Sequence, residues 1–586
     1  MELRRIFLAG FLIMLVWVIW GAFFTPQPKK TASVDQGSSV QNQEEGGENT
    51  GLDQKNMKDG NSEENVKVEY GDPVLLTVET GLFSAVLSNE LGGTFLQYTL
   101  KGDRYSGAYT NESAAFGKDT RHSYDENGKI SFLFTEQEGY SPCNPCLKGV
   151  ETNNVHQVYV NDSLIDQTGH TEVVKKATTI EFRSNEFVHT ITINPDSYMV
   201  LHEYRLGEEM SSQPKSVIWA NGTRPSEKYG WLDDQNSYGM FLTKNSEDSD
   251  YLTGNSNLAD DALYFNEDIE WVASRNKYFV SAIVPAKESG VRLGKIVPGE
   301  GSSFADTYKY RGSNASVYDL ELEFNNYKDF KFYSFLAPLE YSVVSSGDIN
   351  DLDDIMTMGG SVLRPISKFI LGVTNFLNKY VPFGGYALVL ILFALIVRVV
   401  AGPLTKLSLE STRKMQEVQP KIKEIQDKYK DNPKKLQSKI METYKNHNVN
   451  PLSGCFLMLL QWPIMIPPFI LFRSMIELRG EPLFLWIQDL SLPDYMFELP
   501  FHIPLLGIGN GYTGIGLLPI LMGITLYLTM KQSSGSMPQQ NKAMLYTMNG
   551  MFVLLFNSFP AGLNLYYVVY NILNYLQQRK TSQSKK

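Results

Sequence analysis

The C-terminal third of the chain contains five apolar segments that lack Asp and Glu, near residues 384–402, 453–473, 514–530, 543–559 and 561–577. A helix needs about 20 apolar residues to cross the hydrocarbon core of a bilayer. Within that core, only helices and closed barrels satisfy every backbone polar group. The five segments therefore predict a bundle of membrane-spanning helices over 384–577.

A sixth apolar segment lies at the amino terminus. Residues 6–24 carry no charge, follow two arginines and include Trp17 and Trp20, which suit a membrane–water interface. We interpret residues 1–25 as an uncleaved signal anchor that spans the membrane. The alternative is a cleaved signal peptide, whose apolar region would be shorter and would end in small residues.

The chain as a whole is too polar to be a membrane bundle alone. Charged residues make up 20% of it, and its mean hydropathy is −0.21. Residues 26–65 are mainly Gly, Ser, Asn, Gln and acidic residues, and 31–65 include no aromatic residue. Such a composition buries too little apolar surface to offset chain entropy, so 26–65 is predicted to be a disordered acidic linker.

Residues 66–350 are predicted to form a large domain of β-strands. Residues 74–78, 178–183 and 188–193 are rich in β-branched residues, and the last two largely alternate with period two. Turn sequences such as Asn194-Pro195-Asp196 separate these runs. The pattern favours an all-β antiparallel sandwich, extended over two sheets because the segment is long.

The paired cysteines of this domain, Cys143 and Cys146, lie in a proline-rich turn. A zinc site would need two further ligands nearby, and the sequence has no second Cys-x-x-Cys. A local disulfide or two inert thiols are the interpretations we favour, and no metal or other cofactor is expected.

Basic residues give the orientation of the helices. They concentrate in segment 403–450, in the tail 578–586 and around the short loop flanked by Lys531 and Lys542. With six spans, all three lie on the side of the amino terminus. The positive-inside rule then places both termini in the cytoplasm of a bacterium, the chain in the inner membrane and the β-domain in the periplasm.

Two amphipathic segments flank the first span of the core. Residues 361–380 place Leu363, Ile366, Phe369 and Val373 on one helix face, which suits a helix lying in the membrane surface. A helix packed on the β-domain is the alternative. Residues 405–448 predict a charged helical hairpin with a narrow apolar seam, which either guides a nascent chain or touches a ribosome, or is a solvated spacer.

Arg398 is the most informative residue because it interrupts the apolar run 388–400. An ionised guanidinium inside a span costs about 2.5–3.5 kcal/mol on insertion scales. None of the six predicted spans contains Asp or Glu. A hydrophilic cavity would accommodate this cation. Snorkelling of Arg398 to the cytoplasmic headgroups is the alternative.

Other predicted spans supply polar residues and helix-breaking prolines that could line such a groove. Each polar residue alone is more simply explained as a contact between helices. Together with Arg398, the candidate groove residues are Gln461, Pro463, Asn549, Asn564, Tyr566 and Tyr567.

No motif indicates an energy source or a catalytic centre. The chain lacks a phosphate-binding Gly-x-x-x-x-Gly-Lys-Ser/Thr motif, His-Glu-x-x-His and Gly-x-Ser-x-Gly. We therefore predict that it is not an enzyme, and that any transport is driven by partitioning or by the membrane potential. The charge asymmetry fits two compartments better than a nucleic-acid partner.

At these residues the sequence resembles the YidC/Oxa/Alb family of membrane protein insertases, in its Gram-negative YidC form. The matching motifs occur in order at 396–398, 403–405, 419–422, 450–455, 461–464, 485–490, 559–563 and 565–567, with a further match at 87–93. The resemblance implies a five-helix insertase core and a periplasmic β-supersandwich. It also implies Arg398 as the groove cation and Tyr566 and Tyr567 as substrate-facing aromatics. Ala394 departs from the family, which often has Thr or Ser there.

The resemblance also implies a function and partners. The chain would insert and help to fold integral membrane proteins, alone or with the Sec translocon. Nascent membrane proteins would be its substrates, the lipid bilayer its environment, and the ribosome a weak partner of the hairpin and the basic tail. A small-solute transporter, a sugar-modifying enzyme similar to aldose mutarotases and a passive assembly scaffold are the alternatives.

Overall fold

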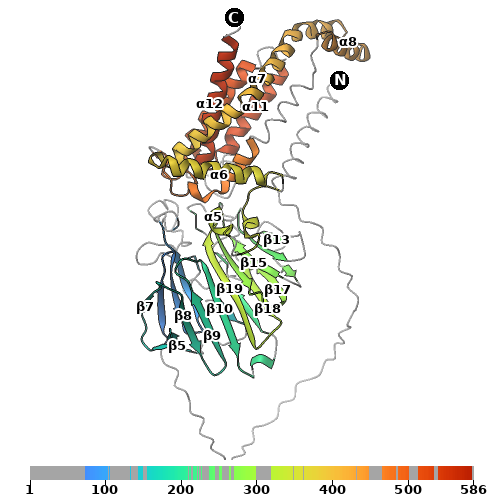
Figure 1. The fold of residues 1–586 in the computed structure, drawn as a ribbon. Coiled ribbons are helices and arrows are strands. Elements are labelled where there is room, and N and C mark those ends of the chain that lie inside the picture. The colour runs from blue at the N-terminus through green and yellow to red at the C-terminus, as the bar shows by residue number, and fades with distance from the viewer. Residues whose placement is uncertain are drawn as a thin grey trace, which may run out of the picture. The chain divides into compact units, whose positions relative to one another are not determined.

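The computed structural model describes residues 73–583 with gaps, and Figure 1 draws the described elements in colour. The longer gaps are 106–131, 134–142, 149–154, 244–249, 254–262, 299–317, 448–464, 500–512 and 534–538; the others are one to four residues long. The predicted signal anchor and the acidic linker lie outside the described residues.

Three sheets form the β-rich part of the chain. The largest has ten described strands in the order β13-β12-β15-β16-β19-β10-β9-β8-β5-β6. Its strands are β5 (Gln157–Val160), β6 (Ser163–Ile165), β8 (Thr178–Arg183), β9 (Phe187–Ile193), β10 (Met199–Leu206), β12 (Tyr238–Thr243), β13 (Asp250–Thr253), β15 (Ile269–Arg275), β16 (Phe279–Pro285) and β19 (Asp329–Pro338).

The two smaller sheets have the orders β3-β2-β1-β7 and β14-β17-β18-β11-β4. Their strands are β1 (Leu75–Glu79), β2 (Phe83–Ser88), β3 (Thr94–Leu100), β4 (Cys146–Leu147), β7 (His170–Val173), β11 (Ser216–Trp219), β14 (Leu263–Phe265), β17 (Val291–Pro298) and β18 (Tyr318–Phe324). The expectation of two antiparallel sheets was therefore wrong in two respects. The described residues of this domain form three sheets, and β1 pairs with β7 in parallel.

Period-two alternation explains why the best strand predictions were confirmed. In β8 and β9 the residues alternate between buried and half-buried, as expected for strands with one face on a core. Asn194-Pro195-Asp196 forms the turn to β10, and β9 and β10 pair antiparallel. The inner faces of the three sheets share one apolar cluster, which includes Phe95, Trp219 and Phe332.

A second apolar cluster joins the other side of the ten-stranded sheet to the segment that leaves the β-domain. Trp271 and Phe335 of the sheet pack there with Val344, Leu352 and Ile355. The last three residues come from α5 (Tyr341–Val344) and the 3-10 helix η5 (Leu352–Ile355). The exit from the β-domain is therefore part of its packed structure.

Cys143 and Cys146 form a disulfide, in agreement with the first interpretation of the pair. Cys143 and Cys146 are buried with Leu91 and Ala220.

The C-terminal part is mainly helical. The described helices are α6 (Arg364–Tyr380), α7 (Gly385–Lys428), α8 (Pro433–Asn446), α10 (Leu517–Ser533), α11 (Gln539–Phe556) and α12 (Ala561–Gln583), with the 3-10 helices η6 (Pro382–Gly384) and η7 (Ile476–Leu478). Residues 465–474 are also helical. A hairpin of β20 (Tyr495–Leu499) and β21 (Thr513–Gly516) precedes α10, a feature absent from the sequence-based prediction.

The first span of the core and the first arm of the predicted hairpin belong to one continuous helix, whose apolar part ends at Pro403. α7 continues through Pro403 and Pro420 as one helix of 44 residues, so the first arm of the hairpin extends the span. The predicted apolar seam is confirmed. Val418 and Ile422 are buried against Ile440 and Tyr444 of α8.

One described helix is both long and apolar enough to cross a membrane, namely Gly385–Pro403 at the start of α7. Leu517–Lys531, within α10, is a shorter apolar helix. The count of six spans, made from the sequence, remains a prediction.

A chain of neutral polar groups crosses the core of the β-domain. His189 Nδ1 lies 2.6 Å from the Gly92 carbonyl, His189 Nε2 lies 3.0 Å from His202 Nδ1, and His202 Nε2 lies 2.8 Å from Ser334 Oγ. Because the carbonyl can only accept, His189 must donate from Nδ1 and accept at Nε2. His202 therefore donates to His189 and accepts from Ser334.

These histidines make the stability of the β-domain depend on pH. Burial lowers the pKa of His189 to about 3 and that of His202 well below its ordinary value. Below about pH 6.5 the two imidazoles bind protons in the unfolded chain but remain neutral in the folded domain. The free energy of unfolding is therefore highest above that pH and decreases as the pH falls. We expect a loss of up to about 1.4 kcal/mol per pH unit for each histidine.

Pulse proteolysis in urea between pH 7 and pH 5 measures this slope. A free energy of unfolding that stays flat over this range would contradict the assignment of neutral, buried imidazoles.

Candidate functional site

Arg398 lies on the inner face of α7. Phe393, Ala394 and Arg398 are buried, whereas Val399 and Val400 are exposed. The buried positions recur at the spacing of one helix face, so the guanidinium points into the bundle while the aliphatic side chains cover its outside. This placement disfavours snorkelling to the headgroups.

Arg398 packs over an aromatic ring of the last helix. Its Cζ atom lies 5.7 Å from the ring centroid of Tyr570 on α12, within the range of a cation–π interaction. α12 packs against both α7 and α10. The sequence-based list of groove residues omitted Tyr570. Its spacing of four residues from Tyr566, which places both rings on one helix face, could have identified it.

The two predicted substrate-facing tyrosines are buried between helices. The Tyr566 ring centroid lies 5.7 Å from that of Phe393 and 6.1 Å from that of Tyr570. The Tyr567 hydroxyl donates to the Met465 carbonyl at 2.8 Å. Tyr566 therefore belongs to the same cluster as Arg398, whereas the hydroxyl of Tyr567 binds the helix at 465–474.

The two predicted asparagines hold backbone segments together. Asn549 Nδ2 on α11 donates to the Gly523 carbonyl on α10 at 3.0 Å. Asn564 Nδ2 donates to the carbonyls of Phe556 and Phe559 at 3.1 Å and 3.3 Å. These contacts agree with the simpler interpretation of each residue as a link between segments. Gln461 and Pro463 lie outside the described residues.

One loop caps the amino termini of three helices of the bundle. The first N–H groups of a helix lack partners within it and need acceptors from elsewhere. Residues 475–494, here called the capping loop, supply them. Glu481 Oε2 accepts from Tyr386 N at the start of α7 at 3.3 Å, and Asp494 Oδ2 accepts from Leu518 N at the start of α10 at 2.7 Å.

The start of α12 binds the backbone of the same loop. The N–H groups of Ala561 and Gly562 donate to the carbonyls of Leu492 and Leu490, at 2.7 Å and 2.8 Å. The capping loop therefore fixes the ends of α7 and α12, the two helices that carry Arg398 and Tyr570.

Burial affects the acidic residues of the capping loop. Desolvation raises the pKa of Asp494 to about 6, although backbone N–H groups at the start of α10 oppose the shift. Desolvation also raises the pKa of Asp489. The negative charge of these carboxylates is therefore less favourable there than in water.

Several of the C-terminal helices expose large apolar side chains on their outer faces. The exposed large apolar residues include Leu395, Ile396, Val399 and Val400 on α7, Ile520, Leu521, Ile524 and Leu528 on α10, Met551 on α11, and Ile572 and Leu576 on α12. Apolar outer faces on several neighbouring helices are typical of contact with lipid.

The comparisons with known proteins agree with this architecture. The family model of the YidC periplasmic domain matches residues 150–372, and that of the 60 kDa inner membrane protein matches residues 376–586. The membrane protein insertase YidC of Prosthecochloris aestuarii is 31% identical over 97% of this chain and 92% of its own length. The chain belongs to the YidC family.

A second curated relative supports the same assignment. The membrane protein insertase YidC of Pelodictyon phaeoclathratiforme is 33% identical over 87% of this chain and 82% of its own length. A solved structure, described as the active YidC insertase with its first transmembrane domain resolved, is 17% identical, with a TM-score of 0.33 over 86% of this chain and 91% of its own. The family model of the YidC periplasmic domain covers the strands of the β-rich part from β5 to β19.

Gly562 allows α12 to approach the capping loop closely. A Cβ atom at this position would lie 3.0 Å from Leu478 Cδ1, 3.2 Å from Leu390 Cδ1 and 3.2 Å from the Leu490 carbonyl oxygen. Gly562→Val should therefore lower the free energy of unfolding by about 1–3 kcal/mol through overpacking. Thermal unfolding in detergent measures the loss.

Gly550→Ala provides the matched control. Among the described residues, and apart from its own helix backbone and chain neighbours, no atom lies within 4 Å of a Cβ built at Gly550 in α11, so alanine should be neutral or should stabilise the helix by up to about 1 kcal/mol. Equal melting temperatures for Gly562→Val and the unchanged chain would show that α12 does not depend on this close approach.

Proposed function

We propose that the chain is a membrane protein insertase and chaperone, which inserts and helps to fold integral membrane proteins through a hydrophilic groove containing a positive charge. Arg398 carries the proposal. Its guanidinium is held on the inner face of an apolar helix and packs against Tyr570. A permanent cation at such a position needs a function that offsets its desolvation.

The proposed mechanism is electrostatic and needs no nucleotide. An acidic or polar substrate tail enters the groove from the cytoplasm and is attracted by Arg398. Gln461, Pro463 and the polar groups of Asn549, Asn564, Tyr566 and Tyr567 would line or support its path. Moving one negative charge to the positive outer face gains about 2.3 kcal/mol per 100 mV. The apolar segment of the substrate then partitions into lipid beside the helices.

The proposed setting is the bacterial inner membrane, with six spans, both termini in the cytoplasm and the β-domain in the periplasm. Nascent membrane proteins would be the substrates, and the chain would act alone or with the Sec translocon. The hairpin of α7 and α8 and the basic tail 578–586 would give a weak contact with the ribosome.

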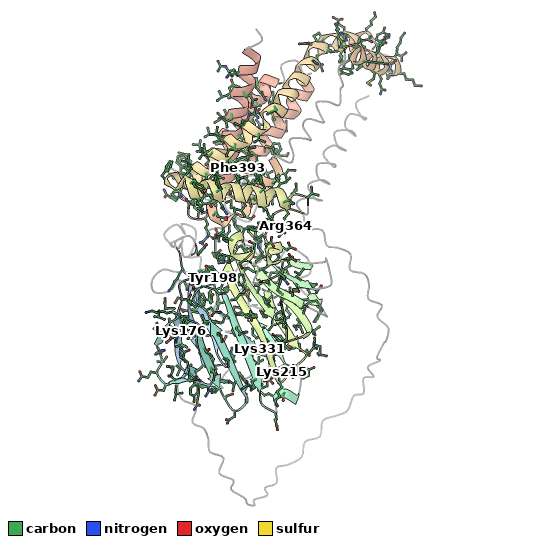
Figure 2. The ribbon with its side chains drawn as sticks, in the orientation of Figure 1. Lys176, Tyr198, Lys215, Lys331, Arg364 and Phe393 are labelled. Carbon is green, nitrogen blue, oxygen red and sulfur yellow. A yellow bond between two sulfur atoms is a disulfide. The ribbon has the colours of Figure 1, made fainter. Side chains whose placement is uncertain are left out.

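Helix α6 fits a place in the membrane surface. Phe369, Phe376 and Tyr380 are exposed along it. Arg364 lies at its start (Figure 2). The Arg364 guanidinium forms ion pairs with Asp353 and Asp354 at 2.9 Å and 2.7 Å. α6 also packs against α7.

His189 and His202 in the core of the β-domain do not provide the catalytic histidine that a sugar-modifying enzyme would need. His189 and His202 are fully buried and bond to each other and to Ser334, so neither imidazole can face a sugar.

Substitutions of Arg398 test the proposal in a host depleted of its own insertase. Substrates with an acidic tail should be translocated by the unchanged chain and by Arg398→Lys, which keeps the charge. Arg398→Ala should reduce translocation, and Arg398→Glu should reduce it at least tenfold, because a like charge then faces the tail. Protease protection of the tail is the readout.

A matched substrate with an uncharged tail separates charge from damage to the bundle. Arg398→Glu should affect it less than the acidic one. Equal translocation by all four chains would contradict the electrostatic mechanism. Failure of the unchanged chain, when stably present in the membrane, would contradict the insertase function itself.

A further inference from the structure

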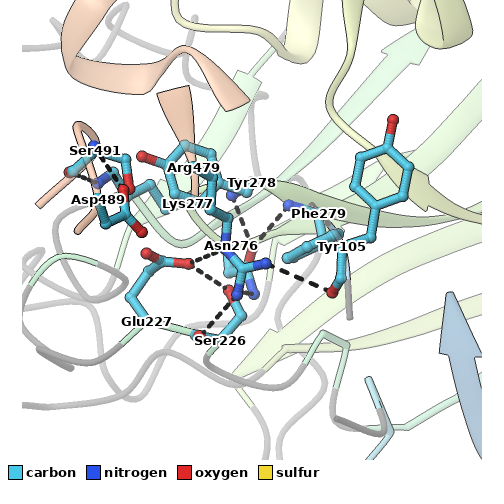
Figure 3. A network of polar contacts seen from close by, with 10 residues as sticks. All are labelled: Tyr105, Ser226, Glu227, Asn276, Lys277, Tyr278, Phe279, Arg479, Asp489 and Ser491. Atoms are coloured by element: carbon cyan, nitrogen blue, oxygen red, sulfur yellow. Dashed lines mark hydrogen bonds and ion pairs between the residues drawn. The ribbon is translucent and has the colours of Figure 1, made fainter. Parts of the chain in front are cut away.

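A buried ion pair connects the β-domain to the capping loop. Arg479 Nε lies 2.9 Å from Glu227 Oε1, and the two side chains are 2% and 0% exposed (Figure 3). The two residues are 252 positions apart in the sequence. An ion pair at this depth is costly to form and much more costly to break, because breaking it leaves one charge buried without its partner.

Further contacts fix the geometry of the pair. Arg479 Nη2 donates to the Ser226 carbonyl at 3.3 Å and Arg479 Nη1 to the Tyr105 carbonyl at 3.5 Å. The guanidinium carbon lies 5.5 Å from the ring centroid of Phe279, at the start of β16. The planar fork of arginine suits such a site, where donors point in several fixed directions.

Two more contacts tie the same loop to the β-domain. Ile476 is fully buried in the apolar cluster shared by the three sheets. Lys277, also buried, donates from Nζ to the Ser491 carbonyl at 3.2 Å. Ser491 N in turn donates to Asp489 Oδ1 at 2.7 Å, which holds this turn of the loop.

The capping loop thus has two sets of contacts. One set, through Ile476, Arg479 and Ser491, binds the β-domain. The other, through Glu481, Leu490, Leu492 and Asp494, binds the amino termini of α7, α10 and α12. Leu478 lies between the sets and would contact a Cβ placed on Gly562 of α12.

We propose that Glu227 and Arg479 are positioning residues for insertion: their ion pair docks the β-domain on the capping loop, and the docked loop holds α7 and α12 in the register that places Arg398 against Tyr570. The consequence for insertion rests on the function proposed above. The consequence for helix register does not depend on that function.

The test uses the full chain with Glu227→Met, which leaves the Arg479 charge buried, and with Glu227→Met/Arg479→Met, which removes both charges. Apolar residues of similar volume can replace a buried ion pair without loss of stability. Glu203→Met is the matched control, because the pair of Glu203 with Lys331 lies on the surface of the same domain and contributes little.

Two readouts are measured for each chain. The first is translocation of the acidic-tailed substrate, normalised to the amount of chain in the membrane. The second is cross-linking of cysteines at positions 402 and 577 by a short bismaleimide, with Cys455 changed to serine. Gln577 Nε2 donates to the Gly402 carbonyl at 3.5 Å, so this cross-link reports the packing of α12 on α7.

We expect Glu227→Met to lower both translocation and cross-linking about tenfold. The double variant should restore both to within about twofold of the unchanged chain, and Glu203→Met should change neither. If Glu227 and Arg479 had separate structural roles, the second substitution would not restore translocation and cross-linking. Such rescue therefore indicates that the two residues act as a pair.

Wild-type values for Glu227→Met would overturn the proposal, as would a double variant that accumulates but is as defective as the single one. If Glu227→Met does not accumulate, the double variant tests the proposal instead. Restored accumulation and cross-linking would support docking by the ion pair, and failure to restore them would overturn the proposal. If the unchanged chain fails to translocate while cross-linking follows the expected pattern, the insertase function is contradicted and the docking role stands.

Discussion

The capping of helix amino termini is the constraint on which the membrane part of this chain depends. α7, α10 and α12 each begin with N–H groups that no helical carbonyl can accept, and one loop supplies acceptors for all three. The acceptors differ in kind, with the side chains of Glu481 and Asp494 for two helices and backbone carbonyls for the third. A single loop of the chain therefore determines how these helices stand relative to one another.

The capping loop and the helical bundle each contain a buried arginine that is held by specific contacts. Arg479 is neutralised by Glu227 and further bonded by carbonyls, so its burial gives a specific docking contact. Arg398 instead packs against the ring of Tyr570, in a bundle whose predicted spans contain no carboxylate. Breaking either contact would leave a buried charge without its partner, which costs free energy. Each arginine therefore favours one arrangement of the residues around it. The first fixes the loop, and the second defines the proposed groove.

Local patterns in the sequence predicted individual helices and strands. Contacts between residues far apart in the chain could not be predicted from it. The alternation at 178–183 and 188–193 gave β8 and β9, and the charge inside an apolar run singled out Arg398, because both signals lie within a few residues. The third sheet, the parallel pairing of β1 with β7 and the Glu227–Arg479 pair join segments far apart in the chain. Tyr570 was missed because its importance depends on which face of α12 meets α7.

The most direct test of the central claim is a photo-crosslinking measurement on translating ribosomes. A photoreactive phenylalanine analogue replaces Tyr570 in one chain and the exposed Ile524 of α10 in another. If the substrate passes Arg398, the acidic tail of a substrate arrested during insertion should cross-link to position 570 and much less to position 524. A tail that cross-links only to position 524 would show that the substrate passes along the lipid face, and would contradict a charged path between α7 and α12.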